Sequence, residues 1–141
     1  MRSTRTVCSA ILATIAILAS GARGTTCVWG KKFKVRQACG QVKDSAGAAI
    51  PSASVQVSRL GQPEKAIAVE TDAEGKFQFS GISDGEYQMR VKFAGFWDAS
   101  QPFVVTGAKA NPVCTNPIRI VMKPAGQCSY VENAWKKAES H

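Results

Sequence analysis

The sequence has a single histidine, His141, which is also its last residue. Catalysis by a histidine-based triad and metal sites built on several imidazoles are therefore not expected. The H-E-x-x-H pattern of zinc proteases does not occur, and no two cysteines form a C-x-x-C pair. Because these residues and motifs are missing, we expect no enzymatic activity, no metal site and no cofactor.

Long hydrophobic runs are also scarce. The longest, residues 7–19, has about 13 residues, whereas a helix that spans a bilayer needs roughly 20. Arg2 and Arg5 precede it and small residues at 20–24 follow it, which is the three-part pattern of a secretory signal peptide. We interpret residues 1–24 as this peptide, in preference to a membrane anchor, and expect no integral membrane span in the mature chain.

Cleavage would change the charge and the cysteine count. It would remove three of the 18 basic residues and none of the 10 acids, which leaves a net charge of +5. It would also remove one of the five cysteines. Those that remain are Cys27, Cys39, Cys114 and Cys128. An even number in an exported chain predicts two disulfides and a secreted or periplasmic location. A zinc site is the alternative, and the missing C-x-x-C spacing argues against it.

Apolar and polar residues alternate between residues 37 and 123, which is the signal of strands with one buried face. Turns rich in Asp and Gly separate the alternating segments, and no helical pattern lies between them. The sequence therefore predicts an all-β, antiparallel sandwich. Seven strands are expected, at residues 38–43, 53–60, 66–72, 76–80, 86–93, 101–106 and 117–123.

The motifs also follow one another in a recognisable order: Gly40-Gln41-Val42-Lys43-Asp44, Ile50-Pro51, Thr71-Asp72, Gly75-Lys76-Phe77, Gly85-Glu86-Tyr87 and Ala94-Gly95-Phe96. Over residues 38–123 this series resembles the carboxypeptidase regulatory-like domain, a transthyretin-like (prealbumin-like) Greek-key β-sandwich. The resemblance implies an accessory, binding or stalk module and no peptidase activity. On this basis the chain divides into the signal peptide, an extension at 25–37, the sandwich at 38–123 and a tail at 124–141.

The resemblance also implies a disulfide pairing. Sandwiches of this kind place the first and last strands side by side and parallel. Cys39 begins the first predicted strand and Cys114 shortly precedes the last, so these two cysteines are expected to pair. Cys27 and Cys128 would then join the two tails. The other two connectivities stay open at this point.

The C-terminal tail carries a helical pattern. Ser129-Tyr130-Val131-Glu132 has the spacing of a capping box, and apolar residues recur at helical intervals after it. The sequence predicts a short helix at residues 130–138, with Trp135 packed on the sandwich and a disulfide at Cys128 anchoring the tail.

The extension is rich in basic residues. Residues 32–36 alternate, so they could extend the first strand or lie along a sheet edge. Lysines at such an edge oppose aggregation, and this is the interpretation we favour. A polyanion-binding patch is the alternative; its members would be Trp29, Lys31, Lys32, Phe33, Lys34 and Arg36. Nucleic acid is not an expected partner, because the chain is exported and its charge is modest.

Other candidates for chemistry are weak. Asp72, Glu74 and Asp84 stand at turns without the spacing of a calcium-binding loop, so we interpret them as turn-capping residues. A Lys–Asn isopeptide bond would need a lysine such as Lys43, an asparagine such as Asn116 and a buried acid such as Glu70. Lys43 is predicted to point outward and Asn116 to lie in a loop, which argues against the bond.

The surface feature that stands out is the aromatic pair Phe96 and Trp97, after the most regular strand. Phe96 is predicted to enter the core. Trp97 either packs at the edge of the sandwich or stacks on a sugar ring or on an apolar side chain of a partner.

The expected function is therefore that of a non-catalytic module, secreted or periplasmic, that binds a protein or glycan partner or has a structural role at the cell envelope. The alternative is a small secreted inhibitor or regulator of an extracellular enzyme, which would insert residues 94–100 into an active site. Neither the ligand nor the oligomeric state follows from the sequence.

Overall fold

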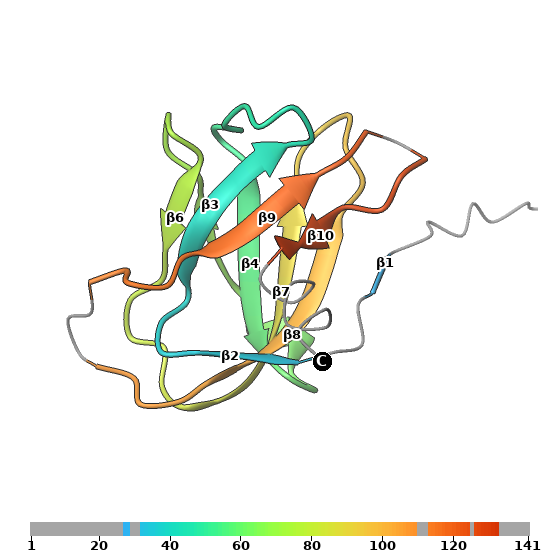
Figure 1. The fold of residues 1–141 in the computed structure, drawn as a ribbon. Coiled ribbons are helices and arrows are strands. Elements are labelled where there is room, and N and C mark those ends of the chain that lie inside the picture. Colours follow the sequence, from blue (N-terminus) through green and yellow to red (C-terminus); the bar gives the residue numbers. More distant parts are fainter. Residues whose placement is uncertain (1–26, 29–31, 110–112, 125, 133–141) are drawn as a thin grey trace, which may run out of the picture.

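The computed structural model describes residues 27–28, 32–109, 113–124 and 126–132. In this part of the chain ten strands form two sheets, and a single short 3-10 helix, η1 (Pro63–Lys65), connects two of the strands. Figure 1 shows the two sheets face to face, with β3 and β9 in the front layer and β4 and β7 behind them. The predicted signal peptide lies outside the described residues.

The larger sheet has the strand order β1-β8-β7-β4-β5, and β2 also pairs with β8. Its strands are β1 (Cys27–Val28), β2 (Phe33–Val35), β4 (Ser54–Arg59), β5 (Ile67–Glu70), β7 (Gly85–Lys92) and β8 (Ala99–Val105). The smaller sheet has the order β10-β9-β3-β6. Its strands are β3 (Cys39–Asp44), β6 (Lys76–Gln78), β9 (Ile118–Met122) and β10 (Tyr130–Val131).

Each of the seven predicted segments contains a strand, but the sandwich differs from the predicted one in two respects. Three more short strands, β1, β2 and β10, come from the extension and the tail. Both sheets are also mixed, because β1 and β2 pair in parallel with β8, and β3 pairs in parallel with β9. Alternation reveals which face of a strand is buried and not which strand lies beside it, so the partner of β2 stayed open although residues 32–36 alternate. The strands β1 and β10 have two residues each and are too short to show a period. The Greek-key connectivity stays a prediction.

The parallel pairing of β3 with β9 runs from Gly40 opposite Ile118 to Asp44 opposite Met122. Gly40 makes this approach possible. A side chain there would collide with the carbonyl oxygen of Ile118 and with the ring of Phe77. The first and last of the seven predicted strands therefore lie side by side in parallel, as the family resemblance implies.

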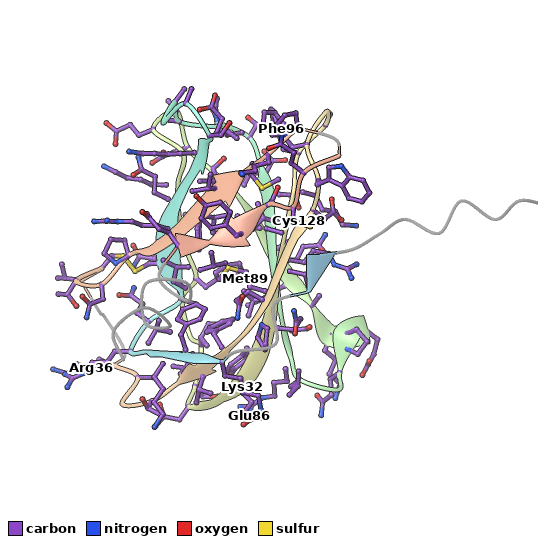
Figure 2. The ribbon with its side chains drawn as sticks, turned by 45° about the vertical axis from the view of Figure 1, so that its right-hand side comes forward. Lys32, Arg36, Glu86, Met89, Phe96 and Cys128 are labelled. Atoms are coloured by element: carbon purple, nitrogen blue, oxygen red, sulfur yellow. A yellow bond between two sulfur atoms is a disulfide. The ribbon has the colours of Figure 1, made fainter. Side chains whose placement is uncertain are left out.

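The hydrophobic core lies between the two sheets and consists of alternate residues from each strand. Its largest side chains that are almost completely buried are Phe103, Met89, Ile118, Ile120 and Met122. Met89 marks the middle of this layer in Figure 2. Burying a side chain of this size contributes about 1.5–3 kcal/mol, so the alternating pattern supplies most of the driving force for the sandwich.

A row of stacked rings fastens the N-terminal segment to the larger sheet. The rings of Phe33 and Phe103 stack with centroids 6.0 Å apart, and those of Phe103 and Tyr87 stack at 5.7 Å. The guanidinium of Arg59 lies 5.2 Å from the centroid of Tyr87. These residues come from the adjacent strands β2, β8, β7 and β4, so residues 33–35 lie along the edge of β8 and do not extend β3.

The C-terminal tail differs from its prediction. Tyr130 and Val131 form β10, which pairs antiparallel with β9, in place of the first turn of the expected helix at 130–138. Glu132, which ends the described part, has helical geometry. Pairing with β9 buries Val131 almost completely, and this packing outweighs the local preference of a capping-box sequence. Trp135 and the rest of the predicted helix lie outside the described residues.

No helix in the described residues has the length and apolar character that crossing a membrane requires. The same residues contain no group of three or more His, Cys, Asp or Glu side chains placed to hold a metal ion.

Candidate functional site

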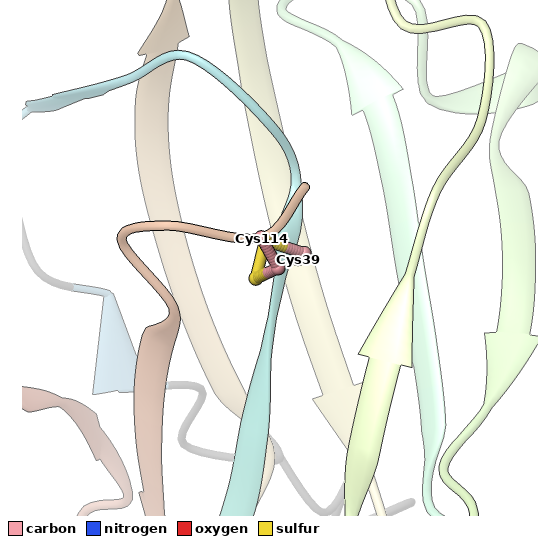
Figure 3. The surroundings of a disulfide bond; sticks show 2 residues. All are labelled: Cys39 and Cys114. Carbon is pink, nitrogen blue, oxygen red and sulfur yellow. A yellow bond between two sulfur atoms is a disulfide. The ribbon is translucent and has the colours of Figure 1, made fainter. Parts of the chain in front are cut away.

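A disulfide joins Cys39, at the start of β3, to Cys114, in the segment that leads into β9 (Figure 3). The two Cα atoms are 6.0 Å apart, and 75 residues separate the cysteines in sequence. This confirms the pairing that the family resemblance implies. Cys39 is 1% exposed, so the bond begins inside the protein and holds the segment before β9 against β3.

Cys128 is also disulfide-bonded. The side chain of Cys27, its predicted partner, lies outside the described part, so that pairing stays a prediction. The backbone is compatible with it. Cys27 pairs with Ala99 at the start of β8, and Ser129, next to Cys128, donates a hydrogen bond to the carbonyl of nearby Trp97.

The loop that joins β7 to β8, residues 93–98, contains the two aromatic residues singled out from the sequence. We call it the aromatic loop. Phe96 is half-buried and packs against the core, with its ring 5.8 Å from that of Phe93. Its backbone forms an isolated bridge with Pro124, just after β9. Phe96 therefore anchors the loop and offers only part of its ring to solvent.

Trp97 is held from both sides by its backbone. Its N–H donates to the carbonyl of Lys123 at 3.0 Å, and its carbonyl accepts a bond of 2.6 Å from the hydroxyl of Ser129. Ser129 is completely buried and also accepts the N–H of Lys123 at 2.9 Å. The indole Nε1 of Trp97 is enclosed without a hydrogen-bond partner. Because an enclosed N–H cannot donate to a ligand, this geometry favours edge packing over ligand contact.

The predicted basic patch of the extension is divided. Lys32 forms an ion pair of 2.9 Å with Glu86, and the two side chains meet at one end of the sandwich (Figure 2). Lys34 is exposed on β2, and Arg36 follows that strand. Lys31 and Trp29 lie outside the described residues. Phe33 belongs to the core, so it is not an exposed member of a polyanion-binding patch.

Two grooves flank the Cys39–Cys114 disulfide, and neither was predicted from the sequence. The first has a volume of about 460 Å³ and lies over β3 and β6, with the segment before β9 as one wall. We call it the amide groove. Its lining includes Gln41, Asp72, Lys76, Gln78, Cys114 and Pro117.

The polar residues of the amide groove are held by a tight turn. Asp72 Oδ1 accepts the N–H groups of Glu74 and Lys76, each at 2.9 Å. The carbonyl of Glu74 accepts a bond of 2.8 Å from Gln41 Nε2, which leaves the Gln41 carbonyl oxygen as an acceptor. The carboxylate of Glu74 lies 2.6 Å from the Lys76 ammonium, and this hydrogen bond raises the pKa of Lys76. Gly75 completes the turn with a φ of +72°, as its place after Asp72 predicts.

The second groove has a volume of about 330 Å³ and lies on the other side of the disulfide. We call it the cationic groove, because Arg36 and Lys109 line it and no acidic residue does so among the described ones. Gln37, Cys39, Thr115 and Asn116 also belong to its lining.

The wall of the cationic groove at residues 107–109 is fixed by Asp84. One carboxylate oxygen of Asp84 accepts the N–H of Gly107 at 3.0 Å, and the other accepts that of Ala108 at 2.8 Å. These two bonds lower the pKa of Asp84, because they favour its charged form. Asp84 is thus a capping residue, as the sequence suggested, but it caps a segment far away in the chain.

The residues considered for an isopeptide bond are not brought together. Lys43 is exposed on β3, and Glu70, an acid we considered for the third role, is exposed on β5 in the other sheet. Asn116 lines the cationic groove before β9. Because the bond requires a buried acid beside the lysine and the asparagine, this arrangement does not support it.

The aromatic loop and the two grooves lie at opposite ends of the sandwich. Trp97 is bonded to Lys123, which follows β9, whereas Cys114 precedes β9. Figure 2 shows Phe96 and Arg36 at opposite ends of the molecule. A ligand in the grooves therefore does not reach Trp97.

A family model described as the carboxypeptidase regulatory-like domain matches residues 39–116, more than half of the chain. No curated protein matches this chain. Among solved structures the chain is similar to the 5-hydroxyisourate hydrolase of Klebsiella pneumoniae, with 19% identity and a TM-score of 0.46. That similarity covers 67% of this chain and 97% of the other. A likeness this distant supports no conclusion about activity.

Proposed function

Because the chain belongs to the carboxypeptidase regulatory-like domain family, we propose that it is a non-catalytic β-sandwich module that binds a protein or a glycan at the cell envelope. A location outside the cytosol, secreted or periplasmic, is part of the proposal. Its support is the Cys39–Cys114 disulfide, since such bonds persist in oxidising compartments.

The observation that carries the proposal is the pair of grooves beside this disulfide. Their volumes of about 460 and 330 Å³ are those of clefts that hold small ligands or parts of larger ones. Their walls are fixed by the disulfide, by the turn at Asp72 and by the bonds of Asp84. Fixed walls reduce the entropy that binding costs, so these grooves are prepared to bind a ligand.

The state of the carboxylates supports the absence of catalysis. Asp84, whose partner Gly107 lines the cationic groove, has both carboxylate oxygens occupied by backbone N–H groups. A general base needs a carboxylate that is available to the substrate and has a pKa near the working pH. The lowered pKa of Asp84 takes it away from that range.

The alternative, an inhibitor that inserts residues 94–100 into an enzyme, receives less support. Ala99 and Ser100 belong to β8 and are buried, so they cannot enter another protein. Of residues 94–100, only the tip at residues 94–95 is exposed. Inhibition therefore remains the second candidate, to be tested with a panel of extracellular proteases and glycosidases.

The proposal is tested with the disulfide-bonded protein on a panel of defined glycans and on an envelope extract. Gln78→Trp places a large ring in the amide groove, and Gln56→Trp is the matched control on the outer face of β4. We expect wild type and Gln56→Trp to retain a ligand that Gln78→Trp loses. Binding by Gln78→Trp at wild-type strength, or no ligand for wild type, would refute the proposal. Hydrolysis of 5-hydroxyisourate, which we do not expect, would contradict its non-catalytic part.

A further inference from the structure

We propose that the two grooves form one continuous binding surface for an acidic glycan, in which the amide groove holds neutral sugar rings and the cationic groove holds a carboxylate group. This inference rests on the proposed function, because it names a ligand class for the same site. It goes further by requiring both grooves to act on a single ligand.

The disulfide makes the two grooves neighbours. Cys39 lines the cationic groove, Cys114 lines the amide groove, and their Cα atoms are 6.0 Å apart. Along β3 the lining also continues without a gap, since Cys39 belongs to one groove and Gly40 and Gln41 to the other. An extended ligand that crosses the disulfide therefore contacts both grooves.

The amide groove has the chemistry of a sugar site. Sugar hydroxyls both donate and accept hydrogen bonds, and the carbonyl oxygen of Gln41, which its bond to Glu74 does not use, offers an acceptor beside Gln78. Lys76 adds a donor and Asp72 an acceptor. Phe77 is only 5% exposed, so its ring is not available to anchor a peptide side chain.

A peptide that adds as a strand fits this surface poorly. β6 ends the smaller sheet, and it has only three residues. Recognition by strand addition depends on a row of main-chain hydrogen bonds, which so short an edge does not provide. The lining therefore favours a glycan over a peptide.

The cationic groove supplies the preference for acid. Arg36 and Lys109 are both exposed and line it with no acid between them among the described residues. The guanidinium of an arginine can bind a carboxylate with two parallel hydrogen bonds. The nearest acid, Asp84, is occupied by the N–H groups of residues 107 and 108, so it does not neutralise either cation by pairing with it.

The test uses two ligands with the same sugar chain, one charged and one neutral: an oligogalacturonide, which is a short uronic-acid chain, and its methyl ester. Affinities are measured by calorimetry on the disulfide-bonded protein. An exposed ion pair changes an affinity by up to about five-fold, so two cations predict a preference of about 10-fold for the acid. The preference should disappear near 1 M salt, where the screening length is only about 3 Å.

Two double variants with the same change in net charge separate the groove from general attraction. Arg36→Gln with Lys109→Gln should bind the acid and the ester equally, with the affinity for the ester unchanged. Lys34→Gln with Lys65→Gln removes two exposed lysines that line neither groove, and it should keep the preference. If both double variants lose the preference for the acid over the ester equally, the inference is overturned.

Four further outcomes overturn it in different ways. Equal affinity of wild type for acid and ester removes the role of the cationic groove and leaves the proposed function intact. If an oligoglutamate binds as tightly as the oligogalacturonide, the surface recognises carboxylate groups and not sugar rings. If the protein binds other glycans but neither the oligogalacturonide nor its methyl ester, only this ligand class is rejected. If the protein binds no ligand at all, the proposed function is rejected as well.

Discussion

Removing the Cys39–Cys114 disulfide tests how this fold is stabilised and how its grooves are held. The perturbation is Cys39→Ala with Cys114→Ala, which leaves the disulfide at Cys128 in place. Closing a loop of 75 residues stabilises a protein by about 4.5 kcal/mol in the chain-entropy model, because it restricts the unfolded chain. This is the expected loss if no other bond constrains the same segment.

The predicted bond between Cys27 and Cys128 changes this magnitude. With that bond closed, Cys39 and Cys114 are also connected by a shorter path of about 25 residues through the two tails. The two paths together act as a smaller loop, whose closure is worth roughly 3 kcal/mol. The size of the loss in unfolding free energy therefore shows whether a bond between Cys27 and Cys128 also constrains the segment that the first disulfide closes.

Urea unfolding of the oxidised proteins, followed by circular dichroism, measures this loss. With a slope of about 1–3 kcal/mol per M, a loss of roughly 3 kcal/mol lowers the midpoint by about 1–3 M. A midpoint that moves by less than about 0.3 M would refute the reasoning, since it would show that the bond does not constrain the unfolded chain. Identical spectra of the two folded proteins are the control for an intact sandwich.

Three further predictions follow from individual contacts. Gly40→Ala should cost more than about 3 kcal/mol in thermal unfolding, because its methyl group meets the carbonyl of Ile118; a small loss would contradict the close approach of β3 and β9. Asp84 has a lowered pKa in the folded protein, so its contribution is present above the ordinary value of 3.8 and is lost as the pH falls below it. Asp84→Asn should therefore make the fall of the unfolding free energy below pH 3.8 less steep, and an unchanged slope in that range would count against this. Trp97→Ala should lower the unfolding midpoint and leave glycan affinity unchanged, whereas lost affinity in a stable variant would restore Trp97 as a ligand contact.

The strand positions could be predicted from the sequence because burial of one face leaves a period of two. In β7 the alternate residues Tyr87, Met89 and Val91 are all buried, and the residues between them are not. The pattern at residues 32–36 indicated β2 but left open whether it extends the first strand or lies along an edge. The two-residue strands β1 and β10 could not be predicted, since their stability comes from a neighbouring strand and not from their own pattern.

The candidate site was harder to predict because it depends on contacts that are distant in sequence. Arg36 and Lys109 line one groove only because the sheets fold together and a disulfide holds the segment between β8 and β9. Trp97 stood out in the sequence as an aromatic residue in a loop. What decides its role is Ser129, a buried hydroxyl 32 residues later in the chain.

The most direct test of the central claim is a map of amide chemical shifts on the assigned, disulfide-bonded protein as the oligogalacturonide is added. The account predicts that the shifts centre on Gln41, Gln78 and Lys109, on both sides of the Cys39–Cys114 bond, and that the amide of Trp97 stays still. Shifts centred on the aromatic loop, with both grooves unchanged, would contradict it.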